Sequence, residues 1–179
     1  TVWSFMSGEF FGNMDPNESL MIASEKLDIA VGRMLVDEVS LANAMIDKIV
    51  NYESKLSYGN WRNDFVIVSD DVDKTWEHET LQVNLDDLGD EVTLEKPYVN
   101  VKKIHSDSYR QIASAGGDRY PDVNDAFENA TEVGALIINY FGHGGEDGLA
   151  SERIYTKETA IEFKNKNKFP CIVTVTCEF

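Results

Sequence analysis

Largely apolar runs alternate along the chain with segments whose apolar residues recur at helical spacing. The runs at 64–71, 132–141 and 170–176 predict strands that are buried within a sheet. Residues 98–104 alternate between apolar and polar side chains, as a strand near a sheet edge does. A shorter apolar strand is predicted within residues 27–36. These runs would supply the strands of one sheet.

Several segments between the runs favour helices. A helix is expected from about Ser40, whose side chain suits the N-cap position. Further helices are expected from about 73–76 to Leu88, and at 123–129 and 156–163. The first helix carries an apolar stripe made of Leu41, Ala44, Met45, Ile46, Ile49 and Tyr52.

Strands and helices thus follow one another in turn, which predicts an α/β fold with a mostly parallel sheet covered on both faces. In such sheets functional residues collect at the carboxyl ends of the strands. Asp70 and Asp71 end the run at 64–71, and residues 142–147 (Gly-His-Gly-Gly-Glu-Asp) follow the next buried run. Residues 176–178 (Thr-Cys-Glu) close the last one. We therefore expect the functional site at these ends.

The length of 179 residues suits a single domain with its own core, after an irregular lead-in at 1–25. Hydrophobic residues make up 42% of the chain, which argues against disorder. The 32 acidic residues outnumber the 16 basic ones, and the net charge of -16 would repel a phosphate backbone, so nucleic acid is not expected as a partner. Most of these acids are expected on a solvated face; loops that bind structural calcium are the alternative.

No apolar run approaches the roughly 20 residues of a membrane-spanning helix, so no transmembrane segment is expected. The N-terminus has no basic region and no signal-peptide shape, and it lacks an initiator Met. We therefore expect the chain to be a piece of a longer protein whose targeting signal lies outside it.

The two cysteines, Cys171 and Cys177, lie on one predicted strand. Six residues of strand span about 20 Å, whereas the Cα atoms of a disulfide lie within about 7 Å of each other. The two cysteines therefore cannot pair with each other, which leaves room for a reactive thiol.

Among the histidines, His143 alone follows a buried strand and lies between glycines, which permit a sharp turn and a close approach of ligand. An imidazole at this place suits proton transfer. Cys177 also ends a strand, and 177 − 143 = 34 positions separate the two, which is room for one helix. Neighbouring parallel strands would place them side by side as nucleophile and base. Taken alone, each has a plain alternative, a turn histidine and a core cysteine.

Two other site types are weaker alternatives. A metal site made of His143, Glu146 and Asp147 has a spacing that resembles neither His-x-x-x-His nor Cys-x-x-Cys. A non-catalytic acidic module that binds partner proteins would keep the fold but need no free thiolate, so Cys177→Ala would leave its function intact. No cofactor is expected, apart from structural calcium in acidic loops.

The histidine and the cysteine lie in distinctive motifs, at 139–146 (Asn-Tyr-Phe-Gly-His-Gly-Gly-Glu) and 173–179 (Val-Thr-Val-Thr-Cys-Glu-Phe). Residues 31–34 (Val-Gly-Arg-Met), the helical segment 46–53 and the pair at 78–79 (His-Glu) precede them. In this order, the segments resemble the gingipain family of cysteine peptidases, peptidase family C25, along nearly the whole chain. The resemblance implies a caspase-like three-layer α/β/α fold.

The resemblance also implies the roles of individual residues. Cys177 would be the nucleophile, and His143 would be the general base and acid. The backbone N–H groups of Gly144 and Cys177 would hold the oxyanion. The candidates for the acid that orients the imidazole are Asp71 or Asp70 and, as a weaker candidate, Glu146.

Within the family, residues 142–150 and the close of the strand at 176–179 are most similar to the surface sortase of the type IX secretion system. This similarity implies a cell-surface enzyme of a Bacteroidetes-type bacterium, which removes C-terminal sorting domains from secreted cargo and joins the new terminus to a lipopolysaccharide. Its partners would be cargo proteins and secretion-system proteins. A plain secreted protease of the same family is the alternative.

Two features depart from the family pattern. Arginine-specific members carry an acid three residues before the His-Glu pair, where this chain has Thr75, so arginine specificity is not expected. The chain also ends two residues after Cys177, whereas the family's catalytic domain continues past its nucleophile. We therefore expect a fold truncated at its C-terminal side, with the remainder of the domain after residue 179, which leaves the activity of this piece on its own open.

Overall fold

The computed structural model of the protein describes residues 9–15 and 26–177. The chain divides into two compact units, residues 1–49 and 50–179, which are described separately here. Of the irregular lead-in expected at 1–25, only the described part can be compared, and it contains a short 3₁₀ helix. The prediction that the whole chain is one partial peptidase domain stays a prediction.

The first unit contains the 3₁₀ helix η1 (Glu9–Gly12) and most of helix α1 (Val39–Tyr52). The helix expected from Ser40 is confirmed, although Ser40 lies inside its first turn and donates to Glu38 Oε2 at 3.1 Å. The strand predicted within 27–36 is wrong, because this stretch forms no strand. An apolar run becomes a strand only where another strand pairs its backbone groups. Among the described residues no strand pairs with this stretch, and only the N–H groups of Asp28 and Ile29 bond elsewhere, to the carbonyl oxygen of Gly12.

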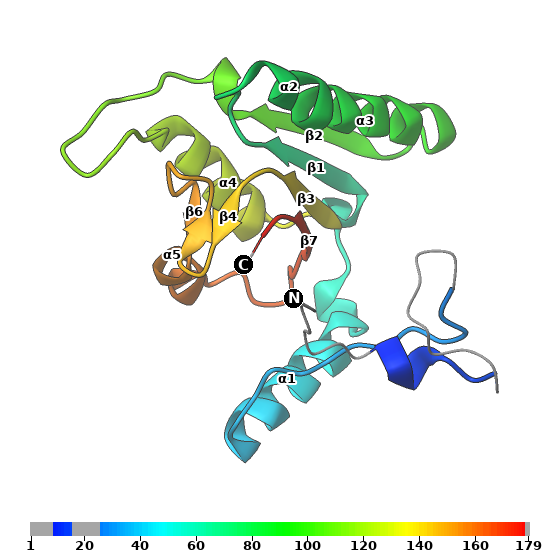
Figure 1. The fold of residues 1–179 in the computed structure, drawn as a ribbon. Helices are drawn as coiled ribbons and strands as arrows, with labels where there is room; N and C mark the ends of the chain where they lie inside the picture. The colour runs from blue at the N-terminus through cyan, green and yellow to red at the C-terminus, as the bar shows by residue number, and fades with distance from the viewer. Residues whose placement is uncertain (1–8, 16–25, 178–179) are drawn as a thin grey trace. The chain divides into compact units, whose positions relative to one another are not determined.

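A four-stranded parallel sheet forms the centre of the second unit (Figure 1). In spatial order its strands are β2 (Asn100–His105), β1 (Asp64–Ser69), β3 (Ile137–Phe141) and β7 (Cys171–Val175). Each neighbouring pair runs parallel, which confirms the mostly parallel sheet. β1 lies inside the sheet and is almost wholly buried, whereas β2 and β7 lie at its edges and keep exposed side chains.

One face of the sheet is covered by a continuous helical stretch, which consists of α2 (Thr75–Glu77), the π-helical η4 (His78–Val83) and α3 (Asn84–Glu95). Leu85 of α3 packs against Phe65 of β1. The start of this stretch agrees with the sequence prediction. Its end lies beyond the predicted one, because the apolar side of α3 continues to pack on the sheet.

The opposite face of the sheet is covered by α4 (Pro121–Val133), whose Val123 and Phe127 are fully buried against β1 and β3. The helix ends at Gly134, which has a φ of 97° and so adopts a conformation that favours glycine. Figure 1 shows α3 and α4 on opposite sides of the sheet. The predicted α/β/α layering is therefore confirmed.

A second, antiparallel sheet follows β3 and consists of β4 (Gly144–Gly145), β5 (Gly148–Leu149) and β6 (Tyr155–Thr156). Helix α5 (Lys157–Glu162) comes next, and Thr156 caps it by accepting the N–H of Thr159 at 3.3 Å. The helix predicted at this place is confirmed. Three further 3₁₀ turns are η2 (Lys55–Ser57), η3 (Asn60–Asn63) and η5 (Ser106–Ser108).

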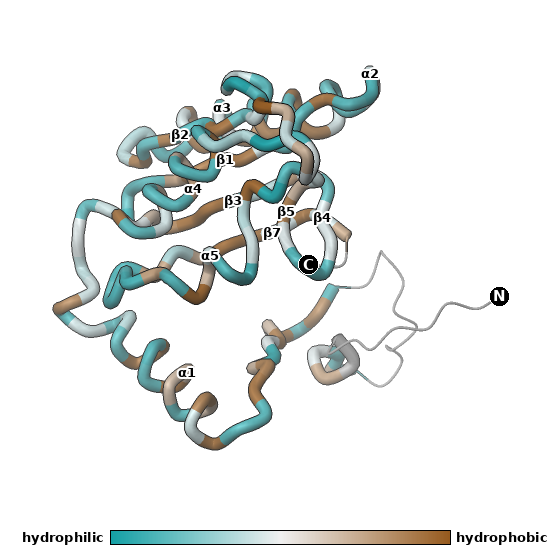
Figure 2. Tube along the Cα trace, turned by 90° about the vertical axis from the view of Figure 1, so that its left-hand side faces the viewer, coloured by the Kyte–Doolittle hydropathy of each residue, from teal (hydrophilic) through white to brown (hydrophobic). Residues whose placement is uncertain are grey.

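Hydrophobic residues are concentrated along β1, β3 and β7, whereas the loops beyond the strands are more hydrophilic (Figure 2). The helices mix both kinds of residue, as elements with one buried side do. In the part of the chain that the structure describes, no helix is both long enough and apolar enough to cross a membrane.

The core beneath α4 gives a first prediction. Phe127 is fully buried, and its ring centroid lies 4.6 Å from that of Tyr155. Phe127→Ala leaves a cavity, and such a truncation costs about 3–5 kcal/mol. We expect the opening free energy of the β1 and β3 amides, measured by native-state hydrogen exchange on the full-length natural protein, to fall by about that amount.

Leu94→Ala is the matched control, because Leu94 is 83% exposed at the end of α3. It should change the same opening free energies by less than about 0.5 kcal/mol. Similar effects of the two substitutions would contradict the core assignment.

Candidate active site

The carboxyl ends of β1, β3 and β7 lie at one edge of the parallel sheet (Figure 1). His143 follows β3 and Cys177 follows β7. Residues paired across these strands are 34 positions apart (171 − 137), which equals the separation of His143 and Cys177 (177 − 143). The neighbouring strands that the sequence spacing predicted are confirmed, and the two side chains leave them at matching positions.

Gly144 lets the loop after β3 approach the end of β7. A Cβ atom on Gly144 would lie 2.4 Å from Oγ1 of Thr176 and 3.2 Å from the carbonyl oxygen of Cys177. A Cβ atom on the next residue, Gly145, would meet nothing within 4 Å. The segment that carries His143 is therefore packed directly against the strand end that carries the cysteine.

The imidazole of His143 is held by a buried acid, Glu77, at the end of the first turn of α2. Nε2 of His143 lies 3.1 Å from Oε1 of Glu77, whose side chain is completely buried. The other carboxylate oxygen, Oε2, accepts the backbone N–H of Lys74 at 2.6 Å. One carboxylate thus joins the start of a helix to the histidine at the sheet edge.

The electrostatics of Glu77 favour its anionic form. Burial alone would raise the pKa of Glu77, but the hydrogen bonds with the His143 ring and the Lys74 backbone N–H bring it below its ordinary value of 4.5. An anionic acceptor keeps the proton of a neutral imidazole on Nε2 and leaves a lone pair on Nδ1. His143 can then accept a thiol proton at Nδ1 and return it to a leaving group.

Asp70 and Asp71 are buried beneath the loop that carries His143. Asp70 Oδ2 accepts the backbone N–H of His143 at 2.8 Å, and its Oδ1 accepts the N–H of Asp71 at 3.0 Å. Asp71 Oδ2 accepts the hydroxyl of Tyr120 at 3.0 Å. The ring contact predicted for Asp71 or Asp70 is made by Glu77 instead, because the two aspartates follow β1 directly and are buried beneath the loop.

The acids beneath the loop differ from Glu77 in their electrostatics. Burial raises the pKa of Asp70 to about 6, although the hydrogen bond from the His143 backbone opposes this. Burial raises the pKa of Glu152 to about 7, and the charge of Asp71 adds to the shift. Burial likewise raises the pKa of Asp71. At these three acids the effect of burial on the pKa outweighs that of their hydrogen bonds, whereas at Glu77 the hydrogen bonds outweigh burial.

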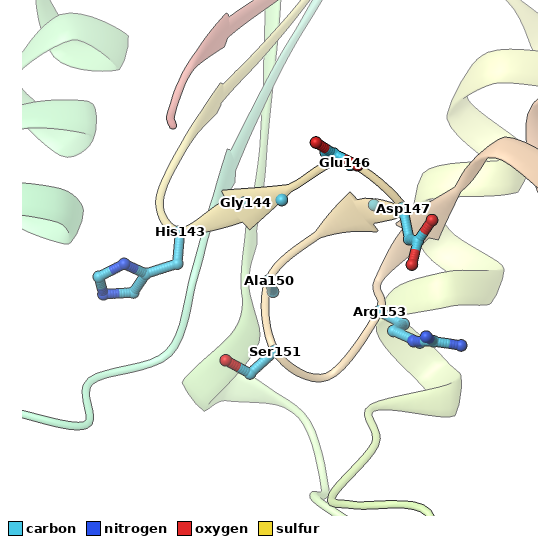
Figure 3. A pocket seen from close by; sticks show the side chains of 9 residues that line it. His143, Gly144, Glu146, Asp147, Ala150, Ser151 and Arg153 are labelled. Carbon is cyan, nitrogen blue, oxygen red and sulfur yellow. The ribbon is translucent and has the colours of Figure 1, made fainter. Parts of the chain in front are cut away.

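A hollow of about 280 Å³ opens beside His143, along β4 and the loop after β5 (Figure 3). Glu146, Asp147 and Arg153 also line it. Figure 3 shows the imidazole pointing away from these three side chains. The structure therefore does not assemble the alternative metal site of His143, Glu146 and Asp147, and it leaves the ring directed toward Glu77.

Cys177 is exposed at the end of β7, and Cys171 is exposed at the start of the same strand. Both thiols are free, as the strand geometry predicted. Among the described residues, hydrogen bonds join the ring of His143 to Glu77 but not to Cys177. In the absence of substrate, the hydrogen bond between a nucleophile and its base is often long or poorly aligned, and it tightens when substrate binds.

Glu77 is the site residue that the sequence did not reveal. It lies one residue before the pair at 78–79 that the family resemblance includes. Nδ1 of His78 itself contacts Oε1 of Gln82, also in η4, at 3.1 Å. The signal available was an acid in the first turn of a predicted helix. Neighbouring acids such as Asp73 and Glu79 offer nearly the same signal, so the sequence could not separate them.

Together, the fold and the site define an α/β domain of the cysteine-peptidase class, in which a thiol and an acid-anchored imidazole lie at the carboxyl ends of adjacent strands. A family model of peptidase family C25 matches residues 2–179, and the chain belongs to this family. The gingipain-type resemblance is thereby confirmed at the level of the family. No match was found among curated proteins.

Two solved structures share the fold. The crystal structure of the Arg-specific cysteine proteinase gingipain R gives a TM-score of 0.65 at 17% identity, over 96% of this chain and 35% of that chain. A complex of the Porphyromonas gingivalis RgpB pro- and mature domains gives a TM-score of 0.66 at 16% identity, over 97% of this chain and 37% of that chain. They confirm the gingipain-type fold, and this chain spans little more than a third of either chain.

The contact between Glu77 and His143 predicts how the thiols react. An oriented imidazole promotes the thiolate of a nearby cysteine, so iodoacetamide should alkylate Cys177 faster than Cys171 in the full-length natural protein. Glu77→Gln should slow alkylation of Cys177 about tenfold or more, because a misplaced base loses up to about 100-fold. Peptide mass spectrometry reads both thiols, and Cys171 serves as the internal control.

The pH dependence of the free energy of unfolding gives a second test of the contact between Glu77 and His143. Because its folded-state pKa is lowered, Glu77 contributes stability above its ordinary pKa of 4.5, and this is lost as pH falls through the lower folded-state value. The Glu77→Gln variant should therefore lose less stability than wild type as pH falls below 4.5. Unchanged alkylation together with an unchanged pH profile would show that Glu77 does not hold the ring.

Gly144 predicts a steric effect on the same edge. In Gly144→Ala the new methyl group meets Thr176, whose γ-methyl would also lie 3.2 Å away, so a rotation of the threonine does not relieve the clash. We expect the alkylation rate of Cys177 to change by about 10- to 100-fold as the strand end shifts. Gly145→Ala, which enters open space, should leave the rate unchanged, and an equal response of both variants would contradict the packing.

Proposed function

We propose that the protein is a cysteine endopeptidase in which Cys177 is the nucleophile and His143 is the general base and acid. The observation that carries this proposal is the anchoring of the His143 imidazole by the buried Glu77 at the strand end next to that of Cys177. Membership of peptidase family C25 supports the same assignment. Glu77 takes the part of a positioning residue, because it acts through the imidazole.

The proposed reaction proceeds through a thioester. His143 Nδ1 takes the proton of the Cys177 thiol, and the sulfur attacks the scissile carbonyl. When the tetrahedral intermediate collapses, the C–N bond breaks and His143 returns the proton to the leaving amine. Water or another amine then attacks the thioester, with His143 removing its proton, and the cysteine is released.

The backbone N–H groups of Gly144 and Cys177 are the proposed oxyanion donors. The close approach of Gly144 to the Cys177 backbone supports this assignment, since it brings the two peptide segments to the same place. Backbone donors of this kind stabilise the charge that develops on the attacked oxygen.

We further propose that the natural acceptor is an amine, so that the enzyme acts as a sortase of the type IX secretion kind. The likeness of residues 142–150 to that branch supports this reading, and this segment forms β4 and β5 beside the hollow at His143. The substrates would be secreted proteins with C-terminal sorting domains, and the enzyme would lie at the outer cell surface with secretion-system proteins as partners.

Arginine specificity is not carried over to this protein. One similar structure is that of an Arg-specific proteinase. The arginine-specific pattern has an acid where this chain has Thr75. This threonine is uncharged and exposed, and it is the first residue of α2. A neutral side chain offers no ion pair to a basic substrate residue. The proposed cleavage therefore depends on the sorting-domain junction rather than on an arginine.

The test is cleavage of a cargo protein that carries its C-terminal sorting domain, followed by intact-mass spectrometry with the full-length natural protein. Wild type should cleave it, and Cys177→Ala or His143→Ala should reduce cleavage by about 10³-fold or more. Cys171→Ala is the matched control, because it removes the other exposed thiol and should leave cleavage unchanged.

Addition of an amine acceptor separates the finer alternatives. A product that carries the acceptor supports the sortase proposal, whereas a hydrolysed product alone points to a plain protease. Equal behaviour of wild type and Cys177→Ala would overturn the catalytic assignment and leave a non-catalytic binding module.

A further inference from the structure

A hollow of about 390 Å³ opens at the amino ends of the strands of the parallel sheet. Its lining includes Asp64 and Asn100, the first residues of β1 and β2, and Lys168, which lies shortly before β7. His143 and Cys177 follow the other ends of the strands. The hollow is therefore separate from the candidate active site, and all residues that line it belong to the second unit of the chain.

The walls of the hollow are largely apolar and accessible to solvent. The exposed fractions of Leu56, Tyr58 and Val133, which line it, are 79%, 60% and 48%. Trp61 also lines it, although this residue belongs to the buried core. Large apolar side chains that gather around one concave place are typical of a ligand site, because a ligand removes their surface from water.

Two glycines allow Trp61 to pack closely against the chain at this place. A Cβ atom on Gly59 would lie 2.8 Å from Cδ1 of Trp61, and one on Gly134 would lie 3.2 Å from the Cβ of Trp61. The same atom on Gly134 would lie 3.0 Å from the Cβ of Lys168. Trp61 and Lys168 therefore both pack against Gly134, and this packing fixes the start of the lysine side chain next to the aromatic wall.

The charge at the hollow is positive, although the net charge of the chain is -16. In the part of the chain that the structure describes, the ammonium group of Lys168 forms neither an ion pair nor a hydrogen bond. Asp64, the acid in the lining, accepts Lys102 Nζ at 2.5 Å and the Asn100 amide at 3.1 Å. The negative charge is thus already paired, whereas the charge of Lys168 is available to a ligand.

A second cation lies behind the aromatic wall. The guanidinium carbon of Arg62 lies 4.5 Å from the ring centroid of Tyr58 and 5.2 Å from that of Trp61. Within the described ranges, Arg62 donates to the Tyr52 carbonyl oxygen and, at 3.2 Å, to Ser57 Oγ, but it pairs with no acid. The guanidinium adds to the positive potential at the hollow, and its cation–π contact stabilises the position of the Tyr58 ring.

We propose that this hollow binds a small organic acid whose apolar body carries a carboxylate. The body would lie against Leu56, Tyr58 and Val133, and the carboxylate would pair with Lys168. The amide of Asn60, which also lines the hollow, can donate a further hydrogen bond. Each part of such a ligand thus meets a matching group of the protein.

The size of the hollow favours a small molecule over a protein partner. A stable protein interface takes about 20–30 residues on each side, whereas nine residues line this hollow. Its volume of about 390 Å³ falls within the range of small-molecule sites, about 300–1,000 Å³. The ammonium group of Lys168 selects an anion, because a neutral ligand would leave it without a partner. Binding here is independent of the proposed function, because it is measured without cleavage of a substrate.

The test measures the binding of hydrocinnamate, a phenyl ring on a short chain that ends in a carboxylate, to the full-length natural protein by ligand-observed NMR titration. We expect wild type to bind it about fivefold more tightly than hydrocinnamamide, which keeps the ring but lacks the charge. Lys168→Met removes the cation and should lower the affinity for hydrocinnamate by about the same factor, while it leaves that for hydrocinnamamide unchanged.

Lys166→Met is the matched control, because it removes the same charge from an exposed lysine that does not line the hollow, and it should behave as wild type. Tyr58→Ala removes part of the apolar wall and should weaken both probes by a similar factor. Both lysines are exposed, so neither substitution disturbs the core. Equal affinities of wild type and Lys168→Met for hydrocinnamate would overturn the proposal. So would a wild type that binds neither probe, or one that binds phenylpropylamine as tightly as hydrocinnamate.

Discussion

The buried carboxylate of Glu77 is the point at which the helical layer and the functional edge of the sheet are joined. Burying an anion without partners is unfavourable, so the hydrogen bonds to both of its oxygen atoms stabilise this side chain in its place. One oxygen accepts the Lys74 N–H at the start of α2, and the other faces the His143 ring. Because both contacts use one rigid group, a shift of the helix start would move the imidazole with it. The position of α2 therefore determines where the imidazole of His143 lies.

The sheet supplies the second half of this arrangement. Strand β3 lies between β1 and β7. The loop after β3, which carries His143, therefore lies between the end of β1, which is followed by Asp70, and the end of β7, which is followed by Cys177. Parallel pairing keeps the register constant, and His143 and Cys177 inherit the offset of the strands they follow. Gly142 is needed here, because a Cβ atom there would lie 2.4 Å from the Cβ of Asp70. The close spacing of three strand ends is what brings the chemistry together.

Much of this arrangement was predictable from the sequence, because buried strands leave an apolar pattern and their ends are marked by polar residues. The adjacency of the strands that precede His143 and Cys177 followed from the spacing of these residues and from the rule for parallel sheets. The role of Glu77 did not, because Asp70, Asp71 and Glu77 are equivalent acids in a linear pattern. Which of them faces the ring depends on where α2 starts and how it packs. The prediction of a strand within 27–36 was wrong for a related reason, because a local pattern does not show whether another strand pairs with it.

The hydrogen bonds around His143 leave one group of that residue for chemistry. Its N–H donates to Asp70, and its carbonyl oxygen accepts the Tyr140 hydroxyl at 2.6 Å and the Ala150 N–H at 2.9 Å. Nε2 faces Glu77, so the backbone and one ring nitrogen are all engaged. A residue held at so many points has little freedom to turn, and its orientation is set before any substrate arrives. Nδ1 remains as the atom that can exchange a proton, and the parallel register places it at the strand end beside the one that bears the thiol.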